Sequence, residues 1–219
     1  MSDDVKPRRR YDSPHRREQA AETRRKIVES AQPLFLDHGY AGTTMAAIAR
    51  ETGVVVETVY RSFGSKAGLF SAVVEAALAG GAERAEIPVE ERPAIAAMVA
   101  EPDPARQLAM YAATQPGIQR RAGPLLRAVR GAAALDPEVA RVWAELEAQR
   151  HAGQSRMAGL LASRGALRDG LSVERASDLI WTLCSLAVYD LLVVERGWTS
   201  EQYESWLVDA LTHELLRPR

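Results

Sequence analysis

The chain has 219 residues, 47% of them hydrophobic, and this length suits one or two domains with a sizeable core. Its lone cysteine, Cys184, excludes a disulfide framework within the chain, and the first 26 residues are too polar for a signal peptide. No run of about 20 apolar residues is free of charges, so we expect no membrane span and a cytoplasmic protein.

The charges are unevenly distributed, although the formal net charge is only −1. Residues 1–66 carry 12 Lys and Arg against 9 Asp and Glu, whereas the remainder carries 16 against 20. A basic N-terminal part on an acidic body is typical of a DNA-binding protein with a separate second domain. Chance patterning is the alternative interpretation.

The first 22 residues are interpreted as a basic, disordered arm, because they are rich in charge and poor in apolar residues. The arm contains Arg8–Arg10, Arg16 and Arg17 together with Pro7 and Pro14. Such an arm can follow phosphates or enter a minor groove, and a solvated tail is the alternative.

A helix is predicted from Arg24 to His38, with Pro33 inside it as a potential kink and Gly39 at its end. Residues 43–66 then predict two short helices joined by a tight turn. Thr44 can cap the first helix, and Gly53 favours the left-handed conformation that ends it. The apolar faces of the two helices are Met45, Ile48 and Ala49, then Val59 and Phe63. This pattern predicts a helix-turn-helix, whose second helix enters the major groove.

Ten residues are candidates for contact with DNA. Thr58 and Arg61 suit base edges, since arginine can bind guanine through O6 and N7. Thr44 can cap its helix and bind a phosphate at once, because helix N-termini favour anions. The full set is Thr43, Thr44, Val55, Val56, Glu57, Thr58, Tyr60, Arg61, Ser62 and Lys66.

At this point the sequence resembles the TetR family of bacterial transcriptional repressors. The resemblance implies backbone contacts by Tyr60 and Lys66. It also implies a homodimer on a pseudo-palindromic double-stranded DNA operator, and a small-molecule inducer bound among the C-terminal helices. The residues that carry it are Gly39-Tyr40, Thr43-Thr44, Ile48-Ala49, Gly53-Val54, Thr58-Val59-Tyr60, Phe63 and Ser65-Lys66.

The run Val55-Val56-Glu57 departs from the family pattern, in which the first position is often polar. Val55 cannot cap its helix, a loss of about 1 kcal/mol. Val56 can contact only a thymine methyl, and Glu57 repels phosphates unless it accepts from cytosine N4. Ala46 also replaces a charged residue common in the family. We therefore expect DNA binding with an atypical base readout.

Beyond a connector at residues 86–93, every segment predicts a helix and none predicts a strand. The expected helices cover residues 105–115, 123–134, 137–164, 172–195 and 200–216. We predict an all-α fold with a three-helix helix-turn-helix domain at residues 23–66. A helical ligand-binding and dimerisation domain is expected at residues 67–219.

The last two helices correspond by resemblance to the family's subunit interface, a four-helix bundle. Residues 172–195 are apolar on nearly all sides, which requires both a core and a partner to cover them. A monomer with a large core is the alternative. The candidate interface residues are Leu191, Leu192, Tyr203, Trp206, Leu207, Ala210 and Leu211.

Polar and aromatic side chains on apolar stripes are the candidates for the ligand pocket, with plain core packing as the alternative for each. Arg150 is the most specific of them, because a cation on an inward stripe needs an anionic partner. That partner is either a ligand carboxylate or a neighbouring glutamate. The candidates are Tyr111, Trp143, Arg150, Met157, Trp181 and Tyr189.

Catalysis and metal binding find no support in the sequence. The four histidines are scattered without ligand-like spacing, and no hydrolase, metalloprotease or P-loop motif occurs. We predict no cofactor, no metal and no catalytic site. Two alternatives to a ligand-responsive repressor stay open, an inducer-independent activator or architectural factor and an all-α enzyme.

Overall fold

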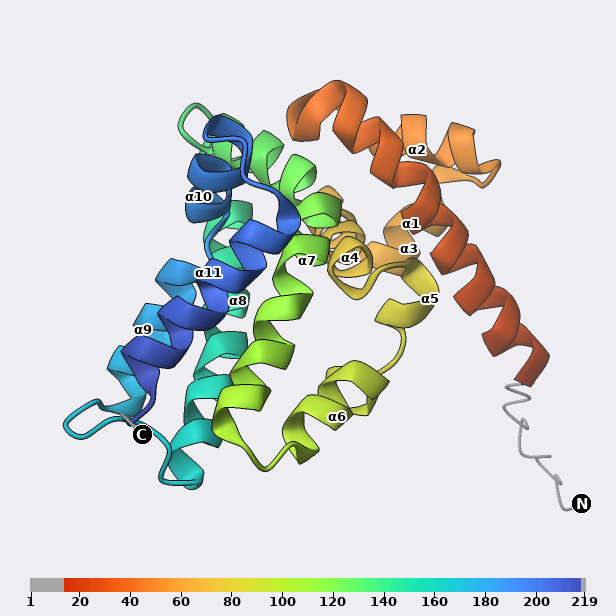
Figure 1. Cartoon of the computed structure of the whole chain (residues 1–219). Helices are drawn as coiled ribbons and strands as arrows, with labels where there is room; N and C mark the ends of the chain where they lie inside the picture. The colour runs from red at the N-terminus through yellow and green to blue at the C-terminus, as the bar shows by residue number, and fades with distance from the viewer. Residues whose placement is uncertain (1–13, 218–219) are drawn as a thin grey trace, which may run out of the picture.

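The computed structural model describes residues 14–217 and contains helices and loops over that range (Figure 1). The N-terminal helices are α1 (Pro14–Gly42), α2 (Met45–Thr52), α3 (Val56–Phe63), α4 (Lys66–Ala79) and α5 (Ala82–Ala85). The 3₁₀ segment η1 (Val89–Glu91) and helices α6 (Pro93–Ala100), α7 (Pro104–Ala133) and α8 (Pro137–Ser163) follow. The chain closes with α9 (Val173–Leu183), α10 (Leu186–Tyr189), the π-helical η2 (Asp190–Glu195) and α11 (Ser200–Leu215). One isolated bridge joins Leu167 to Leu216, and the expectation of an all-α fold is confirmed.

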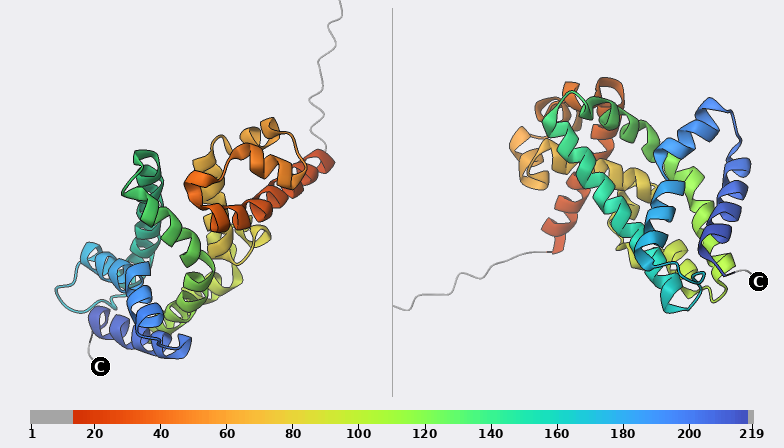
Figure 2. Two further views of the ribbon diagram at one scale, coloured as in Figure 1. Left: turned by 90° about the horizontal axis from the view of Figure 1, so that it is seen from above. Right: turned by 90° about the vertical axis from the view of Figure 1, so that its left-hand side faces the viewer.

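Two parts of the molecule are visible in Figures 1 and 2, a small head and a larger body. We call α1, α2 and α3 the head, and α6 to α11 the body. Helix α4 starts directly after α3 and packs against both α1 and α7. Helix α7 runs through the middle of the body and packs against α8 and α11. Head and body are therefore connected both by α4, which lies against α7, and by α1, which packs against α7 directly.

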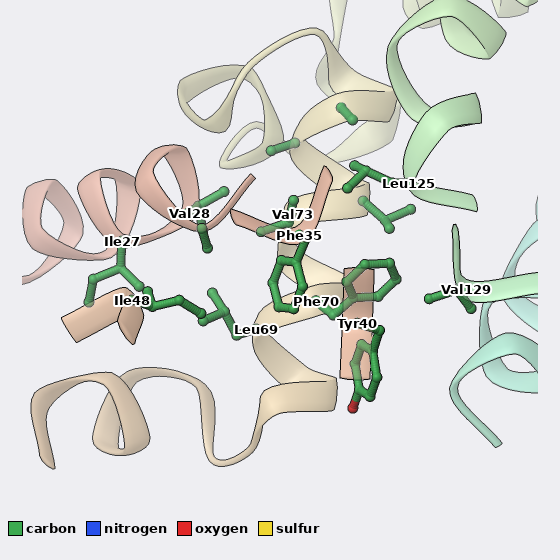
Figure 3. Packing of buried hydrophobic residues seen from close by; sticks show 14 of the residues in the cluster. Ile27, Val28, Phe35, Tyr40, Ile48, Leu69, Phe70, Val73, Leu125 and Val129 are labelled. Atoms are coloured by element: carbon green, nitrogen blue, oxygen red, sulfur yellow. The ribbon is translucent and has the colours of Figure 1, made fainter. Parts of the chain in front are cut away.

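The head is built on an aromatic cluster, shown in Figure 3. The Phe70 ring meets Phe35 edge-on with centroids 4.9 Å apart, and it meets Tyr40 edge-on at 5.3 Å. The same buried cluster continues to Leu125 and Val129 of α7. Because aromatic rings bury large areas, this cluster holds the head on the body through α4.

Helix α1 starts earlier than the sequence indicated. Residues 14–22, which we expected in the basic arm, form its first turns, so the expected boundary at residue 22 lies inside a helix. Residues 1–13 of the expected arm lie outside the described residues. Pro33 is accommodated within α1, and Gly39 takes a positive φ of 67° near its end.

Helix α7 is a single helix where the sequence indicated two. Pro116 and Pro124 lie inside it, although each proline removes one backbone hydrogen bond. The residues around them, including Gln115, Gln119 and Leu125, are buried. Packing on both sides of the prolines thus stabilises a helix that local preference alone would interrupt.

The opposite difference occurs at residues 172–195, where one expected helix is broken. Ser185 has an extended backbone (φ −73°, ψ 152°), and its hydroxyl accepts a hydrogen bond from the N–H of Val188 at 3.2 Å. The carbonyl before the break, that of Cys184, accepts from Nε2 of Gln119 at 3.1 Å. Side chains therefore satisfy backbone groups on both sides of the break.

The segment Val173–Glu195 is nevertheless long and apolar enough, by length and composition alone, to cross a membrane. This differs from our expectation that no such stretch exists. Only 28% of its most apolar window is buried within the chain. Much of an apolar segment thus remains on the surface of a single copy.

Candidate nucleic-acid interface and buried polar core

The turn between α2 and α3 has the geometry that the sequence predicts. The Thr44 hydroxyl accepts from the N–H of Ala47 at 3.1 Å, which caps α2. Gly53 ends α2 in the left-handed conformation with φ 75°. Val59 is fully buried and fixes the inner side of α3. These three local interactions set the direction in which α3 leaves the head.

The outer side of α3 is open to solvent. Val55 is 66% exposed and Tyr60 is 50% exposed, while Glu57 and Arg61 are exposed as well. Val55 makes no side-chain cap, as predicted. Val56, by contrast, is half-buried against the core of the head, which restricts its access to a base.

The polar side chains of α3 are organised around Thr58. Arg61 Nη2 lies 3.5 Å from Thr58 Oγ1, and the Ser62 hydroxyl donates to the Thr58 carbonyl at 2.8 Å. Arg61 is exposed, and Thr58 and Ser62 are partly exposed. The helix therefore presents a guanidinium and hydroxyls beside the apolar pair Val55 and Tyr60.

Thr43 was predicted to contact DNA, but the structure places it in the interior. Its side chain is 1% exposed. Its hydroxyl lies 2.9 Å from the Leu34 carbonyl oxygen and 2.8 Å from the Gly39 carbonyl oxygen, and it donates its proton to this pair. These carbonyls lie on either side of the place where Gly39 interrupts the helical geometry of α1. Thr43 joins α1 to α2 and is too buried to reach a phosphate.

Lys66 is partly buried beside Tyr40. Its ammonium donates to the Tyr40 carbonyl at 3.0 Å and lies 4.4 Å from the centre of the Tyr40 ring. An ammonium has three donors, so one internal hydrogen bond leaves others for a phosphate. The contact also fixes the start of α4 to the end of α1.

Arg24 of α1 was not identified from the sequence. Its guanidinium donates to the Ser62 carbonyl and lies 4.2 Å from the centre of the Phe63 ring. The C-terminal end of α3 is thereby held against α1. A contact across 38 residues leaves no periodic signal in the sequence, so only the fold reveals it.

Arg121 of α7 makes the polar contact between body and α4. Its Nε donates to the Ala77 carbonyl at 2.8 Å, and its Nη2 donates to the Leu78 carbonyl at 3.1 Å. The last carbonyls of a helix have no helical partner and carry partial negative charge, which a guanidinium satisfies. Arg121 was also missed by the sequence, and it links the helix that follows the DNA-binding motif to α7.

Tyr40 forms a second contact between the two parts. Its hydroxyl lies 3.5 Å from Oε1 of Glu138, at the start of α8. Burial, followed by the nearby Glu138 carboxylate, raises the pKa of Tyr40 to about 12. The phenol thus stays neutral at ordinary pH and acts as a hydrogen-bond donor toward the body.

Two hollows occur outside the expected ligand core. A cavity of about 140 Å³ lies between α1, α4 and α5, where Arg25 pairs with Glu86 at 2.8 Å. An open groove of about 490 Å³ lies on α11 beside Trp198 and Trp206. Neither is lined by any of the six predicted pocket residues.

The structure places five of those six residues together within the body and sets one apart. Met157, Tyr189 and Tyr111 pack in one hydrophobic cluster, and Trp181 of α9 lies against the Arg150 guanidinium. Trp143 instead packs against the core of the head, because α8 turns that face toward α1 and α4. We therefore remove Trp143 from the pocket.

The contacts of Arg150 decide whether its anionic partner is a ligand carboxylate or a neighbouring glutamate. Its guanidinium donates to both carboxylate oxygens of Glu147, at 3.1 and 2.7 Å. Nη1 donates to the Trp181 carbonyl at 2.7 Å, and the guanidinium carbon lies 4.8 Å from the centre of the Trp181 ring. The neighbouring glutamate is thus the anionic partner of Arg150.

Glutamines are the polar residues of this core that the sequence analysis missed. Gln107, Gln115 and Gln119 are buried on α7 at the same four-residue spacing as Tyr111, and Gln154 faces them from α8. Their four-residue spacing could have predicted that they share the Tyr111 face of α7, because residues four apart lie on the same side of a helix.

Several buried polar atoms in this core lack a hydrogen-bond partner among residues 14–217. They are the Oε1 atoms of Gln107, Gln119 and Gln154, Nε1 of Trp181 and Oη of Tyr203. Each such atom costs about 1–3 kcal/mol.

Three of the seven predicted interface residues are internal. Tyr203, Leu207 and Leu211 have no exposed surface and pack within the chain's own core, so they cannot touch a second copy directly. Leu191 is 53% exposed, and Leu192, Trp206 and Ala210 are partly exposed. Of the seven, the latter four are therefore the ones that reach the surface of the last helices.

Comparison with known proteins identifies the N-terminal part. Residues 27–73 match the model of the bacterial regulatory proteins of the tetR family. The HTH-type transcriptional regulator TtgR of Pseudomonas putida is 41% identical over 59 residues, which are 27% of this chain and 28% of that protein. The match thus spans about a quarter of the curated relative.

Solved structures resemble the whole chain. NalD, the secondary repressor of the MexAB-OprM multidrug efflux pump in Pseudomonas aeruginosa, has a TM-score of 0.66 at 22% identity. That similarity covers 91% of this chain and all of NalD. FadR of Bacillus subtilis, solved with stearoyl-CoA, has a TM-score of 0.62 at 15% identity over 85% of this chain and 96% of FadR. At these identities the likeness concerns the fold.

Proposed function

This chain belongs to the TetR family of bacterial regulatory proteins, and on that premise we propose that it is a ligand-responsive repressor that binds its operator as a homodimer. The observation that carries the proposal is the exposed face of α3, held in place by buried Val59 and the left-handed turn at Gly53. A regulator of bacterial genes acts in the cytoplasm, which is where we place it.

The proposed DNA contacts follow from exposure and chemistry. Tyr60 and Lys66 bind phosphates through a phenol and an ammonium, and the Thr44 hydroxyl reaches a phosphate at the start of α2. Arg61 and Thr58 face the bases, with Glu57 setting a preference for cytosine. Val55 adds an apolar surface suited to a thymine methyl.

Dimerisation is supported by the uncovered apolar segment Val173–Glu195. Leu191 and Val194 are exposed on it, and Trp206 of α11 is partly exposed nearby. A second copy that packs its own α9 and α11 against this surface would remove it from water. Two copies would then present their α3 helices to successive major grooves, about 34–36 Å apart.

A route from the body to the DNA-binding head is available through α7. Gln119 binds the Cys184 carbonyl in the core of the body, and Arg121, two residues later, binds the end of α4. Ligand binding that shifts α7 would move α4 and change the separation of the two α3 helices. The stearoyl-CoA bound to FadR supports a ligand site in this fold.

An inducer-independent regulator is the second candidate. It is favoured by the fact that the two described hollows do not involve the predicted pocket residues. A melting temperature that no small molecule raises would support it over the ligand-responsive repressor.

The test is a gel shift on DNA that flanks the gene of this protein. We expect Tyr60→Ala and Lys66→Ala each to weaken binding about tenfold and to lower the salt slope by about one, because each removes a phosphate contact. Leu135→Ala is the control, since Leu135 is exposed in the loop after α7 and belongs to neither α3 nor α4. Unchanged binding in both variants would exclude the proposed interface.

A further inference from the structure

The core of the body keeps polar atoms out of water without giving them partners. The Tyr203 side chain has no exposed surface, and its hydroxyl has no hydrogen-bond partner among residues 14–217. The same holds for Oε1 of Gln119 and Oε1 of Gln154, which are both buried. A folded core normally pairs such atoms, so three of them from three helices need a physical explanation.

These atoms gather around Cys184. Gln119 donates to the Cys184 carbonyl, and the side chains of Cys184 and Gln154 lie close enough to Tyr111 to influence the pKa of its phenol. Tyr203 lies close enough for the Cys184 side chain to influence its titration. Helices α7, α8, α9 and α11 therefore converge on one polar region inside an apolar core.

The free hydrogen-bonding capacity of this region is of both kinds. The glutamine oxygens are acceptors, whereas the Tyr203 hydroxyl is both a donor and an acceptor. The indole N–H of Trp181, buried and without a partner among the described residues, adds a donor. An occupant that satisfies them must itself carry donors and acceptors.

The occupant's charge is limited by the surrounding residues. Arg150 is the cation whose charge reaches Tyr111 and Cys184, but its guanidinium is already bound to Glu147 and to the Trp181 carbonyl. Burial raises the pKa of Cys184 to about 12, so this region disfavours negative charge. A buried ion without an ionic partner is strongly unfavourable, whichever its sign.

We propose that this region, around Tyr203, Gln119 and Gln154, is the effector site, and that it binds an uncharged molecule with an aromatic or amide group carrying both hydrogen-bond donors and acceptors. The inference rests on the proposed function and specifies the ligand class of that repressor. It excludes the ligand carboxylate that the sequence analysis left open as a partner of Arg150.

The surroundings can adapt to such an occupant. Met157 packs in the same cluster, and methionine side chains fill irregular spaces readily. The helix is interrupted at Cys184 and Ser185, and the π-helical η2 follows Tyr189. Such irregular helical segments are frequent at functional sites.

The experiment uses three probes of similar size that differ in charge. They are 4-hydroxybenzamide (neutral), 4-hydroxybenzoate (anionic) and tyramine (cationic), each added to the full chain at pH 7.5. We expect the neutral amide to raise the melting temperature and change tryptophan fluorescence at concentrations at least tenfold below either ion. An equal or stronger effect of an ion, or no effect of any probe, would overturn the proposal.

Tyr203→Phe removes only the unpartnered hydroxyl. We expect this variant to melt at the same temperature as the parent or higher, because replacing an unsatisfied polar atom by an apolar one is neutral or stabilising. Its affinity for 4-hydroxybenzamide should fall about fivefold. A lower melting temperature with unchanged probe affinity would give the hydroxyl a structural role and contradict the site.

Gln154→Leu provides the second variant, with Gln149→Leu on the exposed side of the same helix as its control. Only the former should lose the response to 4-hydroxybenzamide. Gel shifts on the flanking DNA, run in parallel, separate the two proposals. If the protein binds DNA but prefers one of the ions, only the proposed ligand class is contradicted. If it binds the amide but no DNA, the proposed function is contradicted.

Discussion

The head and the body differ in how their buried polar groups are satisfied. In the head, the Thr43 hydroxyl meets two carbonyls and the Thr52 hydroxyl donates to the Ile48 carbonyl at 2.7 Å. In the body, buried atoms of Gln119, Gln154 and Tyr203 have no partner among the described residues. The buried hydroxyls of the head are therefore satisfied within the chain, whereas the buried polar atoms of the body are those on which the proposed effector site rests.

The aromatic cluster offers the strongest test of the head. Phe70→Ala should lower the free energy of unfolding by about 3–5 kcal/mol and abolish DNA binding, because Phe70 is buried between Phe35 and Tyr40. Urea unfolding followed by circular dichroism measures the loss. Leu78→Ala on the same helix is the control, since Leu78 is partly exposed and should cost less than about 1 kcal/mol. Equal losses in the two variants would show that the cluster is not what holds the head.

The pair Thr43 and Thr44 separates a structural role from a DNA-binding one. Thr43→Val should cost about 1–3 kcal/mol, because it removes the one buried hydroxyl proton that the Leu34 and Gly39 carbonyls share. Thr44→Val should cost about 1 kcal/mol through the lost cap and also weaken DNA binding. Thermal unfolding and gel shifts on both variants measure this. Weaker DNA binding with unchanged stability in Thr43→Val would instead make Thr43 a DNA-contacting residue.

Arg121 tests whether the two parts communicate through α4. Arg121→Gln removes charged hydrogen bonds to the end of α4 and should cost about 2 kcal/mol, measured by thermal unfolding. Faster hydrogen exchange at residues 66–79 should accompany it. Arg120→Gln is the matched control, since neighbouring Arg120 binds the exposed Ser200 hydroxyl instead. Identical hydrogen exchange in both variants would show that the Arg121 contacts do not couple the body to α4.

The smallest effect concerns alkaline pH. Burial raises the pKa of Cys184 from 9.0 to about 12, so between these values the unfolded chain loses a proton that the folded chain keeps. Stability therefore falls as pH rises above 9, by roughly 1 kcal/mol at pH 10 from this thiol. Cys184→Ala should remove that part of the decline, measured by urea unfolding at pH 8 and pH 10. An unchanged pH dependence would mean that the thiol is accessible to water.

Helix ends were predictable from the sequence because capping is local. Thr44 caps the helix expected of it, and Asp136, Ser172 and Thr199 cap later helices in the same way, each through a backbone N–H within three residues. The left-handed turn at Gly53 follows the same logic. These signals were sufficient for the all-α fold and for the helix-turn-helix, whose parts lie within 24 residues of sequence.

The prediction failed where distant segments compete with local preference. Prolines 116 and 124 remain inside α7 because buried neighbours hold that helix together. Ser185 breaks an apolar helix, with Gln119, from 66 residues earlier, bonded to the carbonyl beside the break. Side-chain packing across the body decided both outcomes.

The sequence by itself thus determined the class of fold, the motif and most of the exposed residues of α3, since short-range hydrogen bonds and periodic burial specify them. Only the tertiary structure decided that Thr43 turns inward, that Arg24 and Arg121 hold α3 and α4, and that Arg150 is bound to Glu147. Which partner a buried polar group meets depends on which helices lie beside it, and helix packing joins residues far apart in the chain.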